Sequence, residues 1–166
     1  MNFIEKVGYK VSFIAKMLTY RVCYRRSFYA GKNLSFRRGF TVNINENGVL
    51  RIGSDVFFNN DCSINCREHI SIGDKCIFGE NVKIYDHNHR FSKFESPILD
   101  QGYTTRQVSI GDNCWIGSNV VILPGSIIHS NSIIGAGCII SGEIPDGVIV
   151  TSNRELQFVK RKRNGK

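Results

Sequence analysis

A six-residue period is the feature that most constrains this sequence. Read in sixes from Ile52, the chain gives IGSDVF and FNNDCS, then INCREHIS with two extra residues, then IGDKCI and FGENVK. The period returns at Ile110 with IGDNCW, IGSNVV, ILPGSI, IHSNSI, IGAGCI and ISGEIP. Position one is Ile or Phe, position two is often Gly, and position five is small or β-branched. Such a period fits neither an α-helix nor a hairpin sheet, and it indicates a solenoid.

Each hexapeptide is consistent with one short strand followed by a turn. The residue at position one would point inward and stack on its counterpart in the next coil, and position five would fill the corner. Gly or Asn at the turn tolerates positive φ. Three units would close a coil of about eighteen residues. We therefore predict an all-β solenoid of parallel coils over residues 33–150, in which residues 33–51 form a degenerate first coil.

The two ends of the chain have a different composition. In residues 1–32, apolar side chains at 3, 4, 7, 11, 14, 18 and 22 fit one face of a helix. This segment is predicted to cap the open end of the solenoid, and a basic amphipathic helix resting on an anionic membrane is the alternative. Residues 151–166 end in FVKRKRNGK, a basic tail. No stacking platform or nucleic-acid-binding module accompanies it, so we expect no nucleic-acid partner.

Charge and cysteine content limit the function classes. The net charge of +8 is compatible with a nucleic-acid partner, an anionic membrane surface, or an anionic substrate or cofactor. The six cysteines form no CxxC pair, and most of them occupy positions in the repeat that require a small side chain. We expect free, packed thiols in a reducing cytoplasm and no metal site. We also expect no signal peptide and no membrane span.

One excursion interrupts the repeat. Residues 85–109 read YDHNHRFSKFESPILDQGYTTRQVS and carry two histidines at their start, His87 and His89. A long segment without the repeat is usually functional or disordered, and this aromatic composition is not typical of disorder. The sequence predicts a protruding loop that presents imidazoles.

Three features together resemble a known family: a histidine at the start of the loop, the stretch VSIGDNCWIGSNVVILPGSIIHSNSIIGAGCII after it, and the closing EIPDGVIV. Over roughly residues 40–152 the chain resembles the hexapeptide-repeat acyltransferases. The resemblance is strongest to the sugar O-acetyltransferases of the galactoside and maltose type, with relatives that decorate bacterial surface polysaccharides. It implies a left-handed parallel β-helix, a hand opposite to that of ordinary parallel crossovers.

The resemblance also implies the catalytic base, which matches His87. Imidazole titrates near neutrality, so it can take the proton of an attacking hydroxyl and pass it to the leaving thiolate. His89 would orient the base or pack on its neighbours. Asp86 would hydrogen-bond an imidazole or cap the turn.

The resemblance also implies residues that bind the acceptor. A family asparagine that contacts the acceptor sugar matches Asn59, or Asn60 if the register shifts by one. Acidic residues that bind acceptor hydroxyls in the family are replaced by Arg67 and Glu68 in INCREH. This departure, with the positive net charge, favours an anionic acceptor such as a sialic-acid-containing glycan.

Acetyl-coenzyme A is the acyl donor that the resemblance implies, bound between adjacent subunits of a homotrimer. Trp115 matches a tryptophan near the thioester, and small residues match the pantetheine arm: Gly117, Ser118, Ala136 and Ser141. Candidate cations for the phosphates are Arg154, Lys160, Arg161 and Lys162. The family's usual closing segment is replaced by TSNRELQFVK, so the resemblance does not assign one of them.

The expected function is O-acetylation of a carbohydrate of a capsule, O-antigen or exopolysaccharide, in the cytoplasm or at the inner face of the membrane. N-acetylation of an amino sugar or nucleotide sugar is the main alternative. A γ-type carbonic anhydrase would need three zinc-binding histidines from two subunits, and a solenoid without catalysis would not bind acetyl-CoA.

Overall fold

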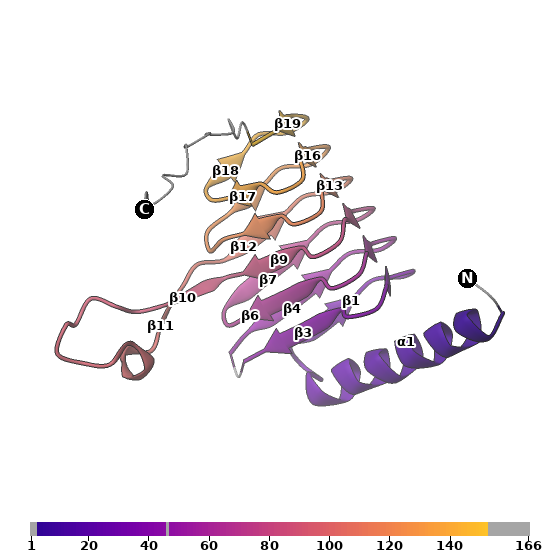
Figure 1. Cartoon of the computed structure of the whole chain (residues 1–166), viewed down its shortest axis with the longest axis horizontal. Helices are drawn as coiled ribbons and strands as arrows, with labels where there is room; N and C mark the ends of the chain where they lie inside the picture. Colours follow the sequence, from indigo (N-terminus) through magenta and orange to yellow (C-terminus); the bar gives the residue numbers. More distant parts are fainter. Residues whose placement is uncertain (1–2, 46, 153–166) are drawn as a thin grey trace, which may run out of the picture.

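The computed structural model describes residues 3–45 and 47–152. Its coils stack into a column, with one helix across the N-terminal end and a long loop that leaves one side (Figure 1). The elements are α1 (Phe3–Cys23), β1 (Phe28–Ala30), β2 (Ser35–Phe36), β3 (Thr41–Ile44), β4 (Val49–Ile52), β5 (Phe57–Phe58), β6 (Ser63–Cys66), β7 (His69–Ile72), β8 (Ile77–Phe78), β9 (Lys83–Tyr85), β10 (His87–His89), η1 (Ile98–Gln101), β11 (Tyr103–Thr105), β12 (Val108–Ile110), β13 (Trp115–Ile116), β14 (Val121–Ile122), β15 (Ile127–Ile128), β16 (Ile133–Ile134), β17 (Ile139–Ile140), β18 (Glu143–Ile144) and β19 (Ile149–Val150).

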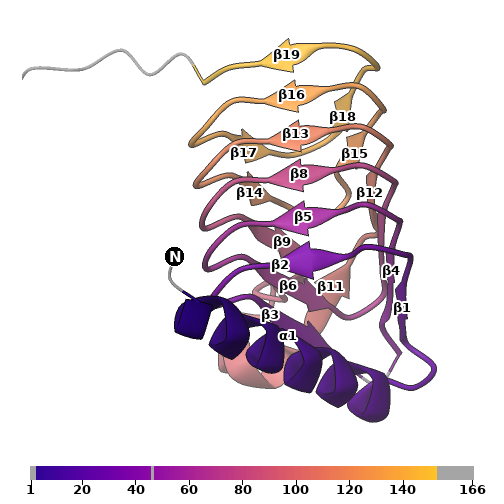
Figure 2. The same cartoon turned by 90° about the vertical axis from the view of Figure 1, so that its right-hand side faces the viewer.

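Three parallel sheets form the faces of the column (Figure 2). Sheet 1 is β1-β4-β7-β12-β15-β18, sheet 2 is β2-β5-β8-β13-β16-β19, and sheet 3 is β3-β6-β9-β14-β17. Each of the first five coils contributes one strand to each sheet in turn, and the last coil contributes β18 to sheet 1 and β19 to sheet 2. The predicted left-handed parallel β-helix is confirmed.

Position-one side chains form the predicted inward columns. In sheet 2 the column begins with Phe36, Phe58 and Phe78 and continues with Ile116 and Ile134, all buried. The rings of Phe58 and Phe78 stack with centroids 4.3 Å apart. Burial of this continuous apolar column is the main stabilising contribution to a solenoid, because each coil covers only its neighbours.

Turn chemistry explains why the repeat tolerates few residue types at its corners. Position four adopts positive φ at asparagines such as Asn113 and Asn119, with φ of 53° and 59°. Amide side chains at this position bond from coil to coil, as between Asn113 and Asn131 at 3.0 Å. At position two, a Cβ on Gly117 would lie 2.7 Å from the backbone nitrogen of Ala136 in the next coil. At this position a side chain would collide with the backbone of the next coil, so glycine permits the close approach.

Helix α1 covers the first coil, as predicted, but not through the predicted apolar face, because Val11, Ile14, Leu18 and Val22 are exposed. Tyr20 is buried, and its hydroxyl donates to the Phe40 carbonyl oxygen at 3.4 Å and accepts from the Val42 amide at 3.2 Å. Nζ of Lys16 donates to the same Phe40 oxygen at 2.7 Å. These side chains form hydrogen bonds with backbone groups at the edge of the first coil, which would otherwise be unpaired.

The first coil starts at Phe28 in β1, earlier than the boundary predicted at residue 33. Phe28 and Ala30 pair in register with Leu50 and Ile52, although the hexapeptide signature is not visible there. The cysteines are free, and all except Cys23 are buried: Cys62, Cys66, Cys76, Cys114 and Cys138.

Candidate active site

The loop leaves the solenoid at one of its three corners. We call the turns between sheet 2 and sheet 3 the second corner, and those between sheet 3 and the next strand of sheet 1 the third corner. The loop is inserted at the third corner, after β9 (Lys83–Tyr85) and before β12 (Val108–Ile110). Its two ends pair as the antiparallel hairpin β10–β11, with His87 opposite Thr105 and His89 opposite Tyr103. This pairing gives the loop base a rigid geometry.

Asp86 is the anchor of the loop base and is fully buried. Its carboxylate accepts the backbone amide of Arg67 at 2.9 and 3.0 Å, and that of Glu68 at 2.8 Å. These two amides belong to the insertion in INCREHIS, one coil below the loop. The longer turn at the third corner therefore supplies donors for a buried carboxylate.

His87 is the second partner of this carboxylate. Its Nδ1 lies 2.9 Å from Oδ1 of Asp86. A carboxylate only accepts hydrogen bonds, so the contact puts the proton on Nδ1 and leaves the lone pair on Nε2. Among the described residues, Nε2 has no hydrogen-bond partner, and the side chain is 16% exposed. The arrangement can accept a proton from a group that approaches from solvent.

Tyr103 organises the space around this imidazole. Its ring makes an edge contact with His87 at 5.5 Å between centroids and a tilted contact with His89 at 4.5 Å. The guanidinium carbon of Arg67 lies 3.4 Å from the centre of the same ring. Nε of Arg67 is buried without a hydrogen-bond partner in the described part of the chain. A cation and two imidazoles therefore surround one aromatic ring at the third corner.

The carboxylate also affects a neighbouring thiol. Burial, and then the negative charge of Asp86, raise the pKa of Cys66 to about 12. This thiol stays protonated at neutral pH, and its Sγ donates to the Val49 carbonyl oxygen at 3.4 Å. Cys66 is thus a packing residue beneath the site and not a nucleophile.

The other predicted residues lie elsewhere on the chain. Asn59 and Asn60 occupy the second corner between β5 and β6, where Nδ2 of Asn60 donates to Glu80 at 3.0 Å. Trp115 is 55% exposed in β13, at the start of the same corner two coils above. Gly117, Ser118 and Ala136 continue this column of second-corner residues.

Sheet 3 separates these residues from His87 within one chain. Ser141 is the exception, because it follows β17 at the third corner, on the side of the loop. Arg154, Lys160, Arg161 and Lys162 lie outside the described residues. Tyr103 was not predicted as a site residue, since its position opposite His89 depends on the hairpin register.

No group of three His, Cys, Asp or Glu side chains converges as a metal site within residues 3–45 and 47–152. Of the four histidines, His129 pairs with Glu143 at 2.7 Å on another part of the surface. In the described part of the chain, no helix has both the length and the apolar character needed to cross a bilayer.

Comparison with known proteins matches residues 107–142 to the family described as bacterial transferase hexapeptide (six repeats). A protein of Mycobacterium tuberculosis assigned as an acetyltransferase is 34% identical over 118 residues, which are 67% of this chain and 39% of the relative. The chain belongs to the hexapeptide-repeat transferases.

Two further relatives show the range of this family. An Escherichia coli O-acetyl transferase assigned to lipopolysaccharide biosynthesis is 29% identical, over 77% of this chain and 70% of its own length. A galactoside acetyltransferase solved in complex with coenzyme A is 32% identical, with a TM-score of 0.57, over 73% of this chain and 58% of that one. This hexapeptide transferase thus spans less than half of the mycobacterial relative.

Proposed function

We propose that this protein is an acetyl-CoA-dependent O-acetyltransferase that acts on a carbohydrate hydroxyl. The observation that carries the proposal is the tethered imidazole: Asp86 holds Nδ1 of His87 at 2.9 Å beside a partly open face of the loop base. The family supports the reaction class, and the galactoside acetyltransferase in complex with coenzyme A supports the donor.

In the proposed reaction, Nε2 of His87 takes the proton of the acceptor hydroxyl as its oxygen attacks the thioester carbonyl carbon. The tetrahedral intermediate then expels the coenzyme A thiolate, which receives the proton from the imidazolium. A carbon–oxygen bond forms and a carbon–sulfur bond breaks, and no acyl-enzyme is required. Asp86 orients the ring and stabilises its transient positive charge. A base of this kind contributes about a hundred- to ten-thousandfold.

A homotrimer with acetyl-CoA between adjacent subunits would complete the site. Within one chain, sheet 3 separates Trp115, Gly117 and Ser118 from His87. A neighbouring copy related by threefold symmetry would bring its second corner to the third corner of the first. The loop offers a contact for this assembly, because its tip exposes Phe91, Phe94, Ile98 and Leu99.

The acceptor is proposed to be anionic. Arg67 presents its guanidinium on the ring of Tyr103, beside both loop histidines, and its Nε is buried without a partner in the described residues. Among the described contacts no carboxylate neutralises it. A planar guanidinium recognises a carboxylate or phosphate through paired donors. An acidic sugar of a capsule, O-antigen or exopolysaccharide fits this charge, and the E. coli relative assigned to lipopolysaccharide biosynthesis supports that class.

The decisive experiment is release of coenzyme A thiol from acetyl-CoA by the purified protein, against neutral glycans, anionic glycans and amino sugars. His87→Ala is compared with His129→Ala, because His129 also pairs with a carboxylate but lies away from the loop. We expect an anionic glycan to stimulate release, and His87→Ala alone to abolish it.

Other outcomes would lead to different conclusions. Stimulation by amino sugars alone would assign N-acetylation. Equal activity of the two histidine variants would remove His87 from the mechanism. No binding of acetyl-CoA, measured by calorimetry, would reject the transferase.

A further inference from the structure

Helix α1 has two apolar faces, and only one of them is used by the fold. Phe13, Met17 and Tyr24 pack against the buried core of the first coil. The opposite stripe comprises Val11, Ile14, Leu18 and Val22, which are 61%, 56%, 58% and 71% exposed. These four residues recur at helical spacing on one side, so they form a continuous apolar surface. A contiguous apolar patch on a surface helix marks an interaction site.

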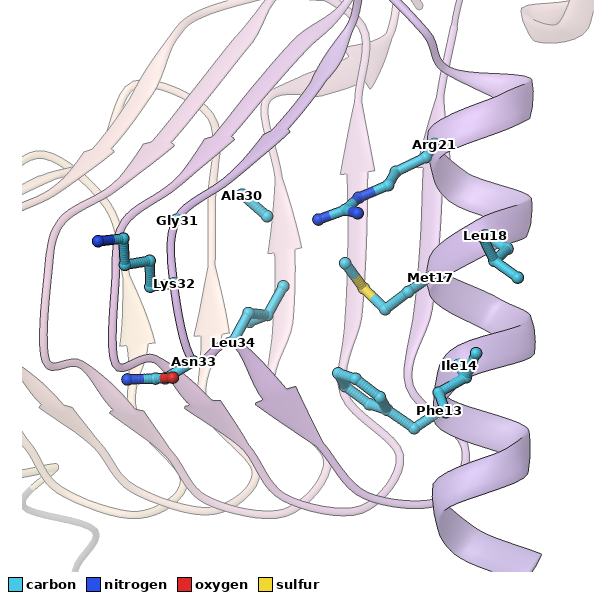
Figure 3. Close-up of a pocket in the computed structure, with 10 residues that line it drawn as sticks. All are labelled: Phe13, Ile14, Met17, Leu18, Arg21, Ala30, Gly31, Lys32, Asn33 and Leu34. Carbon is cyan, nitrogen blue, oxygen red and sulfur yellow. The ribbon is translucent and has the colours of Figure 1, made fainter.

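Ile14 and Leu18 of the stripe also border a groove between the helix and the first coil, toward which Phe13, Met17 and Arg21 point (Figure 3). The groove has a volume of about 620 Å³ and is lined on the helix side by Phe13, Ile14, Met17, Leu18 and Arg21, and on the coil side by residues 30–34. Arg21 and Lys32 bring cations to an otherwise largely apolar lining.

Cations dominate this end of the column, although Asp55 and Asp61 of the second coil contact Asn33 and Arg38 of the first coil. Residues 11–45 contain no Asp or Glu and seven cations: Lys16, Arg21, Arg25, Arg26, Lys32, Arg37 and Arg38. All of these except Lys16 are exposed. We name this surface, the apolar stripe with its surrounding cations, the basic pole.

We propose that the basic pole docks onto an anionic lipid bilayer. An interfacial helix buries an apolar stripe among the acyl chains while cations on its flanks contact anionic headgroups. A second copy of the chain is the less suitable occupant, because it would bring its own cations against the same cations with no acid in residues 11–45 to neutralise them. Among the described residues, no helix covers the other end of the column, which ends with β19.

Docking in this way would fix the height of the active site above the membrane. His87 follows the third coil, and neighbouring strands in a sheet lie about 4.8 Å apart, which puts the imidazole about 10 Å above the first coil. An acceptor anchored in the bilayer would lie within reach. The docking itself does not depend on acyl transfer, since it can be measured with no acyl donor present.

Flotation of the purified full chain with lipid vesicles tests the proposal, in about 0.1 M salt. Vesicles of phosphatidylcholine alone are compared with vesicles that also contain phosphatidylglycerol. We expect binding to the anionic vesicles only, reduced at least about tenfold by Leu18→Gln. The matched control is Ile149→Gln in β19, which is 70% exposed at the other end of the column and should bind normally.

Two double variants test the contribution of the cations to vesicle binding. Arg25→Gln with Arg26→Gln should weaken binding about thirtyfold, since each cation near an anionic surface contributes roughly fivefold. Lys75→Gln with Lys93→Gln removes the same charge elsewhere and should have little effect. Equal binding to neutral vesicles, or no loss in Leu18→Gln when thermal melting shows that it is folded, would overturn the proposal. A Leu18→Gln variant that changes the oligomeric state in light scattering, and not vesicle binding, would assign the stripe to self-association instead.

Discussion

Oδ1 of Asp86 accepts a hydrogen bond from Nδ1 of His87 at 2.9 Å, while the same carboxylate binds the backbone amides of Arg67 and Glu68 one coil below. The carboxylate therefore joins the loop to the solenoid through the imidazole and the two amides. Any change at Asp86 should affect both stability and the orientation of the ring, and these effects can be measured separately.

Asp86→Asn should lower both the free energy of unfolding and kcat. An amide group offers one acceptor where the carboxylate offers two, so a backbone donor or the imidazole loses its partner, at a cost of about 2 kcal/mol. A displaced ring would lower kcat by about a hundredfold. Urea unfolding and the thiol-release assay measure the two effects. Asp112→Asn is the control, because Asp112 also accepts a backbone amide, from Asp74 at 2.7 Å, but lies away from the loop. Loss of stability with an unchanged kcat and pH profile would make Asp86 purely structural.

The sequence predicted the repeat, its inward residues and the helical cap, because stacking of identical coils imposes the period on every unit. Ile116 and Cys114 could be assigned as core residues from their place in the hexapeptide alone. The contacts of Tyr103 with His87 and Arg67 could not be predicted, since they depend on the register of a hairpin that has no period. The sequence also did not predict that the first coil starts at Phe28. Helix α1 covers this end of the column, and the hexapeptide signature is not visible in β1.

Arg67 should determine the preference of the enzyme for an anionic acceptor over a neutral one. Arg67→Ala is expected to raise KM for an anionic acceptor by at least about tenfold, and Arg67→Lys should restore little, because lysine lacks the planar fork and the stack on Tyr103. KM for acetyl-CoA should not change. Arg51→Ala is the matched control, since its guanidinium also lies over a tyrosine, Tyr29, at 4.3 Å. Steady-state kinetics with a neutral and an anionic acceptor decide the question, and equal losses for both would argue against charge recognition.

Trp115 should contribute to donor binding and little to stability. It is 55% exposed, so Trp115→Ala should change the free energy of unfolding by no more than about 0.5 kcal/mol. If it packs on coenzyme A, its loss should weaken binding about thirtyfold. It is the only tryptophan, so its fluorescence in the unmodified protein reports donor binding directly. Ile77→Ala, one coil below in register and 52% exposed, should bind normally. If saturating coenzyme A leaves the tryptophan fluorescence unchanged, Trp115 does not belong to the donor site.

Stability should fall in alkaline solution because of Cys66. Burial and the charge of Asp86 raise the pKa of this thiol to about 12 in the folded chain, against an ordinary value of 9.0. Below pH 9 both states are protonated and the stabilisation is complete. Between about pH 9 and 12 the unfolded chain loses a proton that the folded chain keeps, so each pH unit should cost up to about 1.4 kcal/mol. Urea unfolding at pH 8, 9.5 and 10.5 measures the slope, and Cys66→Ala should reduce it although cavity formation lowers stability at every pH. An unchanged slope in that variant would assign the loss of stability at high pH to other groups. Tyr20 is one of them, because burial also raises its pKa.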